Sequence, residues 1–304
     1  MQTTSHLLMI RPVQFTFNAE TAVNNAFQST KDDNAQETAL KEFDDFVKVL
    51  RTSGIDVTVI DDTKEPHTPD SIFPNNWISF HSDGRIVLYP MYATNRRLER
   101  KPHVIEKVKS KFNVASQVDL SPYEHKNIFL EGTGSMVLDR ENKIAYACLS
   151  QRTDIHVLND FCAQLGFQSV SFVATDAQGF PIYHTNVMMC VADQFVVICL
   201  ESIKEEQKKR KVVSAIEKSK KEIVAITLDQ MNHFAGNMLQ VENKTGKKFL
   251  VMSSQAYRSL TKEQVSAIEK YAAILHSSLD TIERNGGGSA RCMMAEVFLP
   301  AKEN

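Results

Sequence analysis

The stretch WISFHSDGRIVLY, residues 77–89, has the pattern of a β-hairpin. Two apolar runs, 77–81 and 85–89, flank a Ser-Asp-Gly segment, and Asp-Gly is a strong turn signal. Hairpins of the same shape recur along the chain. They join residues 135–139 to 144–148, 187–191 to 195–199, and 238–241 to 249–252. The hairpin is therefore the repeated unit of this fold.

The spacing of these hairpins is regular. The residue before each first strand falls at positions 76, 134, 186, 237 and about 292, so the unit is about 50–60 residues long. The last unit is divided between the two ends of the chain. We expect residues 292–299 to form an apolar strand that pairs with Leu7–Ile10 and closes a ring.

Amphipathic helices and further short strands are predicted between the hairpins. Residues 37–50 and 154–165 have apolar side chains at helical spacing, and each is followed by a short β-rich run. Ser202 and Thr261 each begin a capping-box pattern that predicts the start of a helix. The sequence thus predicts an α/β fold, a five-bladed pseudo-symmetric propeller in which residues 1–304 form a single catalytic domain.

The composition narrows the class of protein. The chain has 304 residues, of which 42% are hydrophobic and 24% charged, which is typical of soluble globular proteins. Its net charge of -2 argues against nucleic acid or an anionic membrane as partner. We see no signal peptide and no stretch long enough to span a membrane. Five cysteines without CxxC spacing favour neither disulfides nor zinc, and we expect a cytoplasmic protein.

Polar or otherwise reactive residues precede the first strands of most units. The clusters are Phe73-Pro-Asn-Asn76, Leu130-Glu-Gly-Thr-Gly134, Tyr183-His-Thr-Asn186, and Gly286-Gly-Gly288 with Cys292. Equivalent strand ends converge on the axis of a pseudo-symmetric ring. We therefore expect Asn76, Glu131, His184, Asn186 and Cys292 to face one central cavity. Thiol, imidazole and carboxylate together are typical of nucleophilic acyl or amidino chemistry.

Each cluster also has a simpler explanation when taken alone. The glycine-rich segment before Cys292 can be a turn beside a buried thiol, and His184 can be a hydrogen-bonded core residue. Asn75 and Asn76 can serve as turn residues. These separate explanations do not account for the common position of the clusters in successive units. That common position favours an active site.

The motifs Phe73-Pro-Asn-Asn76, Leu130-Glu-Gly132, His184-Thr-Asn186 and Gly287-Gly-Ser-Ala-Arg-Cys292 resemble the ordered motifs of the pentein superfamily. This group includes arginine deiminases, dimethylarginine hydrolases and amidinotransferases, and the chain is most similar to the citrulline-utilisation hydrolase branch. The resemblance implies a five-bladed α/β propeller. It also implies that Cys292 is the nucleophile, His184 a general acid and base, and Glu131 a carboxylate that orients the substrate.

The sequence departs from the deiminases at two positions. Asn76 and Asn186 stand where the deiminases typically have aspartates that pair with a guanidinium group. An ionised aspartate only accepts hydrogen bonds, whereas asparagine both donates and accepts without charge. Two amides therefore suit a neutral ureido group, and they favour citrulline over arginine.

The remaining substrate-binding predictions concern the backbone and the arginines. Gly288 and its neighbours are expected to supply amides for a developing oxyanion. Arg96 and Arg97 follow the first hairpin and could hold the α-carboxylate of an amino acid, or could belong to a solvated helix start. Arg284 and Arg291 are further candidates beside the nucleophile.

The leading hypothesis is hydrolysis of citrulline to ornithine, ammonia and carbon dioxide through an S-carbamoyl enzyme. An arginine deiminase or amidinotransferase is the alternative within the fold, and a non-catalytic propeller that only binds ligands is the alternative outside it. We expect a small amino-acid substrate and neither metal nor cofactor. A homodimer is compatible with these features.

Overall fold

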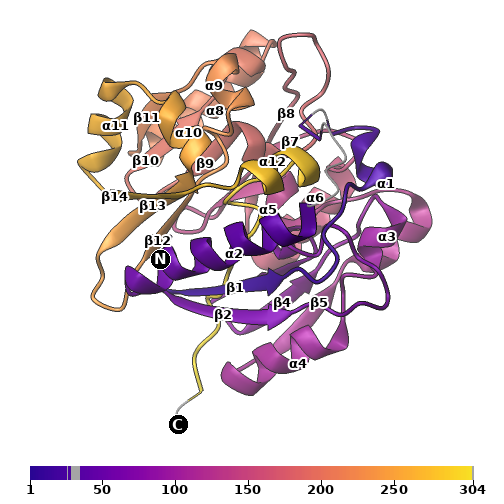
Figure 1. The fold of residues 1–304 in the computed structure, drawn as a ribbon. Helices are drawn as coiled ribbons and strands as arrows, with labels where there is room; N and C mark the ends of the chain where they lie inside the picture. Colours follow the sequence, from indigo (N-terminus) through magenta and orange to yellow (C-terminus); the bar gives the residue numbers. More distant parts are fainter. Residues whose placement is uncertain (26, 29–34, 303–304) are drawn as a thin grey trace.

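The computed structural model describes residues 1–25, 27–28 and 35–302. In this part of the chain the strands form five small sheets of three strands each, arranged around a common centre (Figure 1). The strands are β1 (His6–Arg11), β2 (Asp56–Asp61), β3 (Ile78–Phe80), β4 (Arg85–Leu88), β5 (Ser116–Asp119), β6 (Met136–Asp139), β7 (Ile144–Cys148), β8 (Gln168–Phe172), β9 (Met189–Val191), β10 (Phe195–Ile198), β11 (Glu222–Ala225), β12 (Leu239–Glu242), β13 (Lys248–Ser253), β14 (Ala273–Ser277) and β15 (Ala295–Glu296).

All five sheets have the same topology. An antiparallel pair supplies two strands, and a third strand pairs in parallel with the second of them. The four predicted hairpins correspond to β3–β4, β6–β7, β9–β10 and β12–β13. The ring closes as predicted, because β15 pairs with β1 in the register Leu7↔Glu296 and Leu8↔Ala295. The propeller architecture expected from the repeat is therefore confirmed.

One predicted strand is much shorter than expected. Residues 292–299 were expected to be extended throughout, but only Ala295–Glu296 form β15. The backbone of Cys292 lies in a turn instead, and its N–H donates to the carbonyl of Ser289 at 3.0 Å. The nucleophile candidate is thus held by a turn before the strand rather than by the strand itself.

Helices connect the sheets and pack on their outer strands. The longer ones are α2 (Ala35–Thr52), α4 (Pro102–Lys111), α6 (Ile155–Leu165), α8 (Glu206–Lys218) and α11 (Lys262–Glu269). The apolar face of α2 contacts β2 and β14, α6 contacts β8, and α8 and α11 both contact β11. Shorter helices are α1 (Ala19–Ala22), α3 (Thr94–Arg97), α9 (Leu228–Asn232), α10 (Ser254–Ser259) and α12 (Asp280–Gly286), with the 3-10 turns η2 (Ser121–Lys126) and η3 (Leu200–Ser202).

The two predicted capping boxes have different outcomes. Thr261 caps α11 through two hydrogen bonds. Its hydroxyl accepts from the backbone N–H of Gln264, and its own backbone N–H donates to the side-chain oxygen of Gln264. Ser202 was wrongly predicted to begin a helix. Its hydroxyl donates to the carbonyl of Cys199 inside a 3-10 turn, so it is not free to cap, and α8 begins only at Glu206.

The inner strands bring their starting ends together at the centre. Strand β15 contacts β3, and β9 contacts both β6 and β12. Short helical turns precede three of them: η1 (Pro74–Asn76), α5 (Gly132–Ser135) and α7 (Thr185–Met188). Helix α5 contacts both η1 and α7, and it lies near the middle of the ring in Figure 1. Residues at these turns are therefore neighbours despite their separation in sequence.

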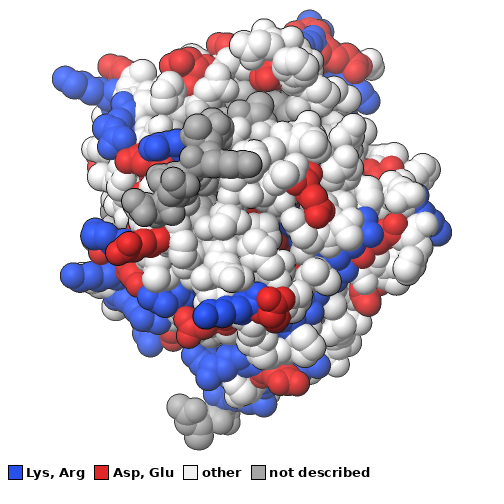
Figure 2. Space-filling model, turned by 45° about the vertical axis from the view of Figure 1, so that its right-hand side comes forward, with Lys and Arg blue, Asp and Glu red and all other residues white. Residues whose placement is uncertain are grey.

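The surface carries charges of both signs. On the face shown in Figure 2, Lys and Arg side chains are interspersed with Asp and Glu, in keeping with the net charge of -2. Within the described ranges, none of the helices combines the length and the apolar character that a membrane crossing requires.

Candidate active site

Cys292 lies in the turn between α12 and β15, with its side chain among three other repeats. Its thiol is buried, and two amide groups approach it: Asn186 Nδ2 at 3.4 Å and Asn237 Nδ2 at 3.3 Å from Sγ. N–H donors directed at a sulfur atom stabilise negative charge on it. The surroundings of Cys292 thus suit a nucleophilic thiolate.

The glycines before Cys292 are required by close neighbours. A Cβ at Gly288 would lie 2.9 Å from the ring of Phe73 and 3.3 Å from the Cβ of Cys292. Gly287 has a φ of +65° and ends α12 in the left-handed conformation. Its N–H donates to the carbonyl of Glu283, so this amide is committed to the helix end. Of the amides expected to hold an oxyanion, that of Gly288 remains a candidate.

His184 and Glu131 form a direct pair. Glu131 immediately precedes α5, and His184 immediately precedes α7, so the two residues occupy the same position in successive repeats. His184 Nε2 lies 2.7 Å from Glu131 Oε2, and both side chains are buried. The backbone N–H of Tyr92 donates to the other carboxylate oxygen at 2.9 Å. The Glu131 carboxylate, held by the N–H of Tyr92, thus orients the imidazole of His184.

The pair is held in a defined ionisation state. Burial raises the pKa of Glu131, but the nearby Arg152 guanidinium and the His184 bond outweigh it and lower the pKa to about 2. Burial lowers the pKa of His184 to about 4, although its bond to Glu131 opposes the shift. At neutral pH an ionised Glu131 therefore accepts the Nε2–H of a neutral imidazole. The lone pair of His184 is assigned to Nδ1.

Gly134 explains how the first and third repeats come so close. A Cβ at this position would lie 2.4 Å from Asn76 Nδ2 and 2.7 Å from His184 Nδ1. No L-residue with a side chain fits there without displacing both groups. The amide of Asn76 and the free nitrogen of His184 therefore face the same small volume.

The amide groups leave specific hydrogen-bonding atoms available. Asn76 Oδ1 accepts from Arg96 Nη1 at 2.8 Å, and Asn76 Nδ2 donates to Asn75 Oδ1 at 3.1 Å. Among the described residues, Asn75 Nδ2 and Asn186 Oδ1 are buried without a hydrogen-bond partner. The centre therefore offers a donor and an acceptor to a ligand.

The predicted arginines are engaged by the protein itself. Arg96 is buried and forms a bidentate ion pair with Glu99, at 2.8 and 3.0 Å, besides its bond to Asn76. Arg97 donates to the carbonyls of Met91 and Tyr92. The guanidinium groups of both residues thus organise the polypeptide around the centre.

The other two arginine candidates, Arg284 and Arg291, differ in their access to solvent. Arg291 donates to the carbonyl of Met294 at 2.8 Å and pairs with Glu296 at 2.8 Å, so it is part of the buried structure around β15. Arg284 lines a surface cleft beside the centre. Of the two, Arg284 is the one placed to meet a molecule from solvent.

Two residues of the centre were not predicted from the sequence. Asn237 stands directly before the fourth hairpin, the position that supplies Asn76 and Asn186 in other repeats, and this position alone would have identified it. Arg152 follows the second hairpin as Arg96 follows the first, and it lies 3.6 Å from Glu131. Applying the repeat reasoning to the fourth hairpin would have found Asn237, whereas the role of Arg152 depends on contacts that only the fold shows.

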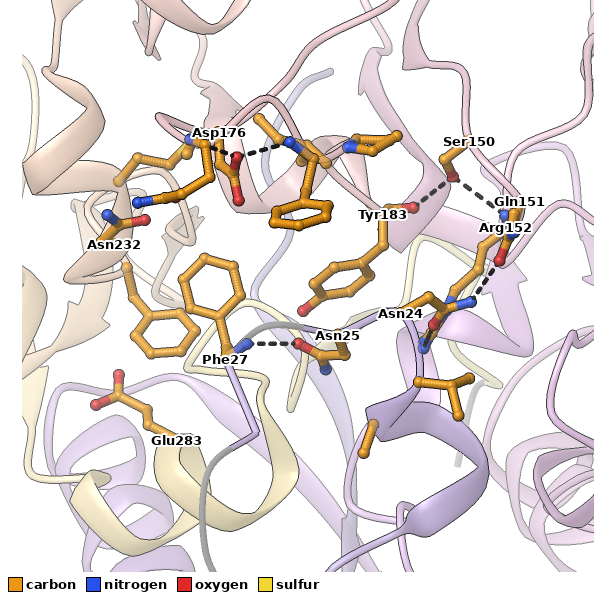
Figure 3. Close-up of a pocket in the computed structure, with 18 of the residues that line it drawn as sticks. Asn24, Asn25, Phe27, Ser150, Gln151, Arg152, Asp176, Tyr183, Asn232 and Glu283 are labelled. Atoms are coloured by element: carbon orange, nitrogen blue, oxygen red, sulfur yellow. Dashed lines mark hydrogen bonds between the residues drawn. The ribbon is translucent and has the colours of Figure 1, made fainter.

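A cleft of about 1090 Å³ adjoins the centre (Figure 3). Arg152 and Tyr183 line it and also contact the buried residues, because the Tyr183 hydroxyl donates to the Gly287 carbonyl at 2.7 Å. Asn24 and Phe27 line the cleft from the N-terminal segment, and Arg152 donates to Asn24 Oδ1. Side chains that line the cleft therefore also contact the candidate centre, although Cys292, His184 and Glu131 do not line the cleft themselves.

The sequence matches the model of one protein family over residues 11–299, described as N,N dimethylarginine dimethylhydrolase, eukaryotic. No match was found among curated proteins.

Solved structures share the fold at low sequence identity. The N-terminal domain of ArgZ, an arginine dihydrolase of the cyanobacterial ornithine-ammonia cycle, has been solved as a cysteine-to-serine variant with bound substrate. It is 17% identical, with a TM-score of 0.76 over 97% of this chain and 98% of that domain. The chain spans 41% of full-length ArgZ. AgrE, in complex with ornithine and NAD+, is 18% identical with a TM-score of 0.76, over 98% of this chain and 40% of that one.

A third structure is a dimethylarginine dimethylaminohydrolase, a histidine-to-glycine variant in an adduct with S-methyl-L-thiocitrulline. It is 14% identical, with a TM-score of 0.67 over 97% of this chain and 100% of that chain.

Proposed function

We propose that this chain, which belongs to the N,N dimethylarginine dimethylhydrolase family of the pentein superfamily, is a cysteine-dependent hydrolase whose substrate is citrulline. The reaction would release ornithine, ammonia and carbon dioxide. The observations that carry the proposal are the two amides that approach Cys292 and the buried His184–Glu131 pair. Helix α7 connects them, because His184 precedes it and Asn186 lies in it. The free state of all five cysteines supports a cytoplasmic enzyme.

In the first half of the reaction, Cys292 Sγ attacks the ureido carbon. His184 is neutral, so its Nδ1 lone pair takes the thiol proton and passes it to the departing amine nitrogen. The C–N bond to ornithine breaks, and an S-carbamoyl enzyme remains. Glu131, ionised and bonded to Nε2, stabilises the imidazolium that forms between these two proton transfers.

In the second half, His184 Nδ1 takes a proton from water as the water oxygen attacks the carbamoyl carbon. The C–S bond breaks, and the proton returns to the Cys292 sulfur. The released carbamic acid decomposes to carbon dioxide and ammonia. The N–H groups of Asn186 and Asn237 stabilise the sulfur anion both before attack and as the leaving group.

The hydrogen-bonding atoms left free in the centre support a ureido substrate. The Asn75 Nδ2 donor suits a carbonyl oxygen, and the Asn186 Oδ1 acceptor suits an NH2 group. We further propose that Arg152, at the boundary between cleft and centre, binds the α-carboxylate of the amino acid. Arg96 is less suited to this role because Glu99 holds it in a close bidentate pair at 2.8 and 3.0 Å, whereas Arg152 lies 3.6 Å from its nearest carboxylate, Glu131.

Arginine is the second candidate substrate. The fold is shared with ArgZ, whose described activity is that of an arginine dihydrolase, and the ionised Glu131 offers one carboxylate to a guanidinium group. Attack of Cys292 on arginine would release ammonia first, and hydrolysis of that intermediate would give citrulline. The two substrates thus share the nucleophile and differ in the first leaving group.

The test incubates the purified protein with citrulline and with arginine and measures ornithine, ammonia and citrulline. We expect citrulline to yield ornithine and ammonia, and Cys292→Ser to lose at least about a thousandfold in kcat. Conversion of arginine to citrulline, with citrulline itself untouched, would establish a deiminase instead. A fully active Cys292→Ser variant would contradict the mechanism altogether.

A further inference from the structure

Glu283 connects helix α12 to the turn that carries the nucleophile. Its Oε1 accepts from the hydroxyl of Ser289 at 2.5 Å, and the Ser289 carbonyl accepts the N–H of Cys292 at 3.0 Å. The Glu283 backbone carbonyl also accepts the N–H of Gly287 at 2.9 Å. We propose that Glu283 is a positioning residue whose carboxyl group sets the placement of Cys292 through Ser289. The inference rests on the proposed role of Cys292.

The contacts of Glu283 hold the turn at two separate points. The backbone bond fixes where the turn leaves α12, and the side-chain bond fixes the residue three positions before Cys292. Ser289 is fully buried, so water does not compete for its hydroxyl. A hydrogen bond from a hydroxyl to a charged oxygen is about twice as strong as one between neutral groups. The ionised carboxylate therefore restrains the turn more firmly than the neutral acid.

The surroundings of Glu283 are unusual for a carboxyl group with only a structural role. Its side chain is 3% exposed, and its Oε2 atom has no hydrogen-bond partner among the described residues. Within the same part of the chain it forms no ion pair with a cation at 4 Å or less. An unpaired buried charge is costly, and stability alone would favour a neutral residue at this site.

Charged groups around Glu283 are mostly acidic. Asp280 lies on the same helix, and Glu42 on α2 caps that helix by accepting from the N–H groups of Thr281 and Ile282. On α10, the Arg258 cation faces Asp280 at 4.0 Å rather than Glu283.

Burial is the main cause that raises the pKa of Glu283 from 4.5 to about 7. The hydrogen bond from Ser289 and the nearby hydroxyl of Ser253 oppose this shift, and Asp280 and Glu42 add to it. The carboxyl group therefore changes charge in the range where the enzyme would work.

Glu283 also borders the surface cleft. Glu283 and Arg284 line the cleft together, and Figure 3 shows the Glu283 side chain on the same side of it as Phe27. Protons can therefore reach the group without passing through the catalytic centre. The carboxyl is placed to respond to the pH of the solution while it contacts the nucleophile turn.

The experiment compares Glu283→Gln, Ser289→Ala and their combination over pH 5.5 to 8.5. Glu283→Gln keeps an acceptor but removes the charge, and we expect kcat to fall about tenfold with KM changed less than about twofold. The inflection of kcat near pH 7 should disappear. Ser289→Ala should give a similar loss, the double variant no more than either single variant, and Ser289→Thr should restore activity.

Glu42→Gln is the matched control. It neutralises another carboxyl whose pKa burial raises and which contacts the same helix, but it does not touch the nucleophile turn. We expect Glu42→Gln to lower the unfolding temperature while the inflection of kcat remains, at a slightly lower pH because Glu42 no longer raises the pKa of Glu283. If Glu283→Gln retains the inflection near pH 7, or if its effect multiplies with that of Ser289→Ala, the proposal is overturned.

A second measurement separates this proposal from the proposed function. The rate at which iodoacetamide alkylates Cys292, read by mass spectrometry of the labelled peptide, needs no substrate. If the parent protein hydrolyses neither citrulline nor arginine, the proposed function fails. Glu283→Gln should still remove the inflection from the pH profile of alkylation, whereas Glu42→Gln should keep it at a slightly lower pH. An unchanged alkylation profile in Glu283→Gln would then overturn the positioning role by itself.

Discussion

The proposed catalytic centre has two halves that lie at neighbouring positions of the repeat but differ in chemistry. One half is charged: Glu131 and His184 form a 2.7 Å pair beside Arg152. The other half is neutral: Asn76, Asn186 and Asn237 present amides. Both halves are buried and both are built at the starting ends of inner strands.

The difference shows how a repeated fold can place proton transfer and substrate recognition on different side chains of one site. The repeat places side chains around one centre, but it does not determine their chemical type. We infer that the charged half moves protons, because it holds the imidazole in one tautomer. The amide half approaches the sulfur and determines which group is recognised, because amides discriminate by the direction of their hydrogen bonds.

The largest effect is expected from the charged half. His184→Gln keeps a hydrogen-bonding side chain next to Glu131 but cannot transfer protons, so kcat should fall about a hundredfold to ten-thousandfold. Steady-state kinetics with citrulline measure this loss of kcat. His276→Gln is the control, since His276 is a half-exposed residue of β14 that bonds Ser254. Comparable losses in both variants would mean that the effect is not specific to the His184–Glu131 pair.

The charged half also predicts how stability depends on pH. In the folded protein the pKa of Glu131 is lowered from 4.5 to about 2, and that of His184 from 6.5 to about 4. The unfolded chain therefore binds more protons in both windows, and stability is lost as the pH falls from 6.5 towards 2. For Glu131 the loss is on the order of 3 kcal/mol.

Urea unfolding at a series of pH values tests this dependence. The slope between pH 6.5 and 4 should become smaller in His184→Gln, because the histidine that differs between the folded and unfolded states is gone. The Asn186→Ala variant, which changes the neutral half, should keep the slope of the parent protein. A parent protein whose stability is constant from pH 6.5 to 4 would contradict the assigned ionisation of the pair.

The architecture could be predicted from the sequence because it repeats. Hairpins such as 77–89 are local, with turn signals that need no tertiary contact, and their spacing implied the ring. The catalytic residues could be predicted where they stand at a repeated position. Arg152 was missed because its role depends on contacts with Glu131 and Asn24, which are distant in sequence.

Interpretation of polar residues from sequence is limited where tertiary contacts decide between local options. Ser202 has the pattern of a helix cap, yet its hydroxyl bonds back to Cys199. Arg96 has the charge needed for a carboxylate, yet the buried Glu99 pairs with it. A sequence shows that a residue can donate a hydrogen bond, but the partner is determined by packing.

Removing one amide from the neutral half should cost less than removing the imidazole. Asn237→Ala takes away one of the two N–H donors to Cys292 Sγ, and we expect kcat to fall about tenfold to a hundredfold. Asn186→Ala removes the other donor and offers the comparison. Asn237 also donates to the Asn186 carbonyl and accepts from the Arg291 N–H, so its loss should lower the unfolding temperature more. Unchanged kcat in both variants would exclude the amides from catalysis.

Asn76→Asp changes recognition rather than proton transfer, and the smallest effect is expected from it. Arg96 can still pair with an aspartate here, and the unpartnered Asn75 Nδ2 can turn to donate to it, so the fold should tolerate the change. The centre loses a donor and gains a negative charge, which favours a guanidinium over a ureido group. The ratio of kcat/KM for citrulline to that for arginine should fall about tenfold. Asn159→Asp, on the exposed face of α6, controls for the added charge. If the ratio does not move in Asn76→Asp, the neutral half does not select the substrate, and the division of labour between the two halves is wrong.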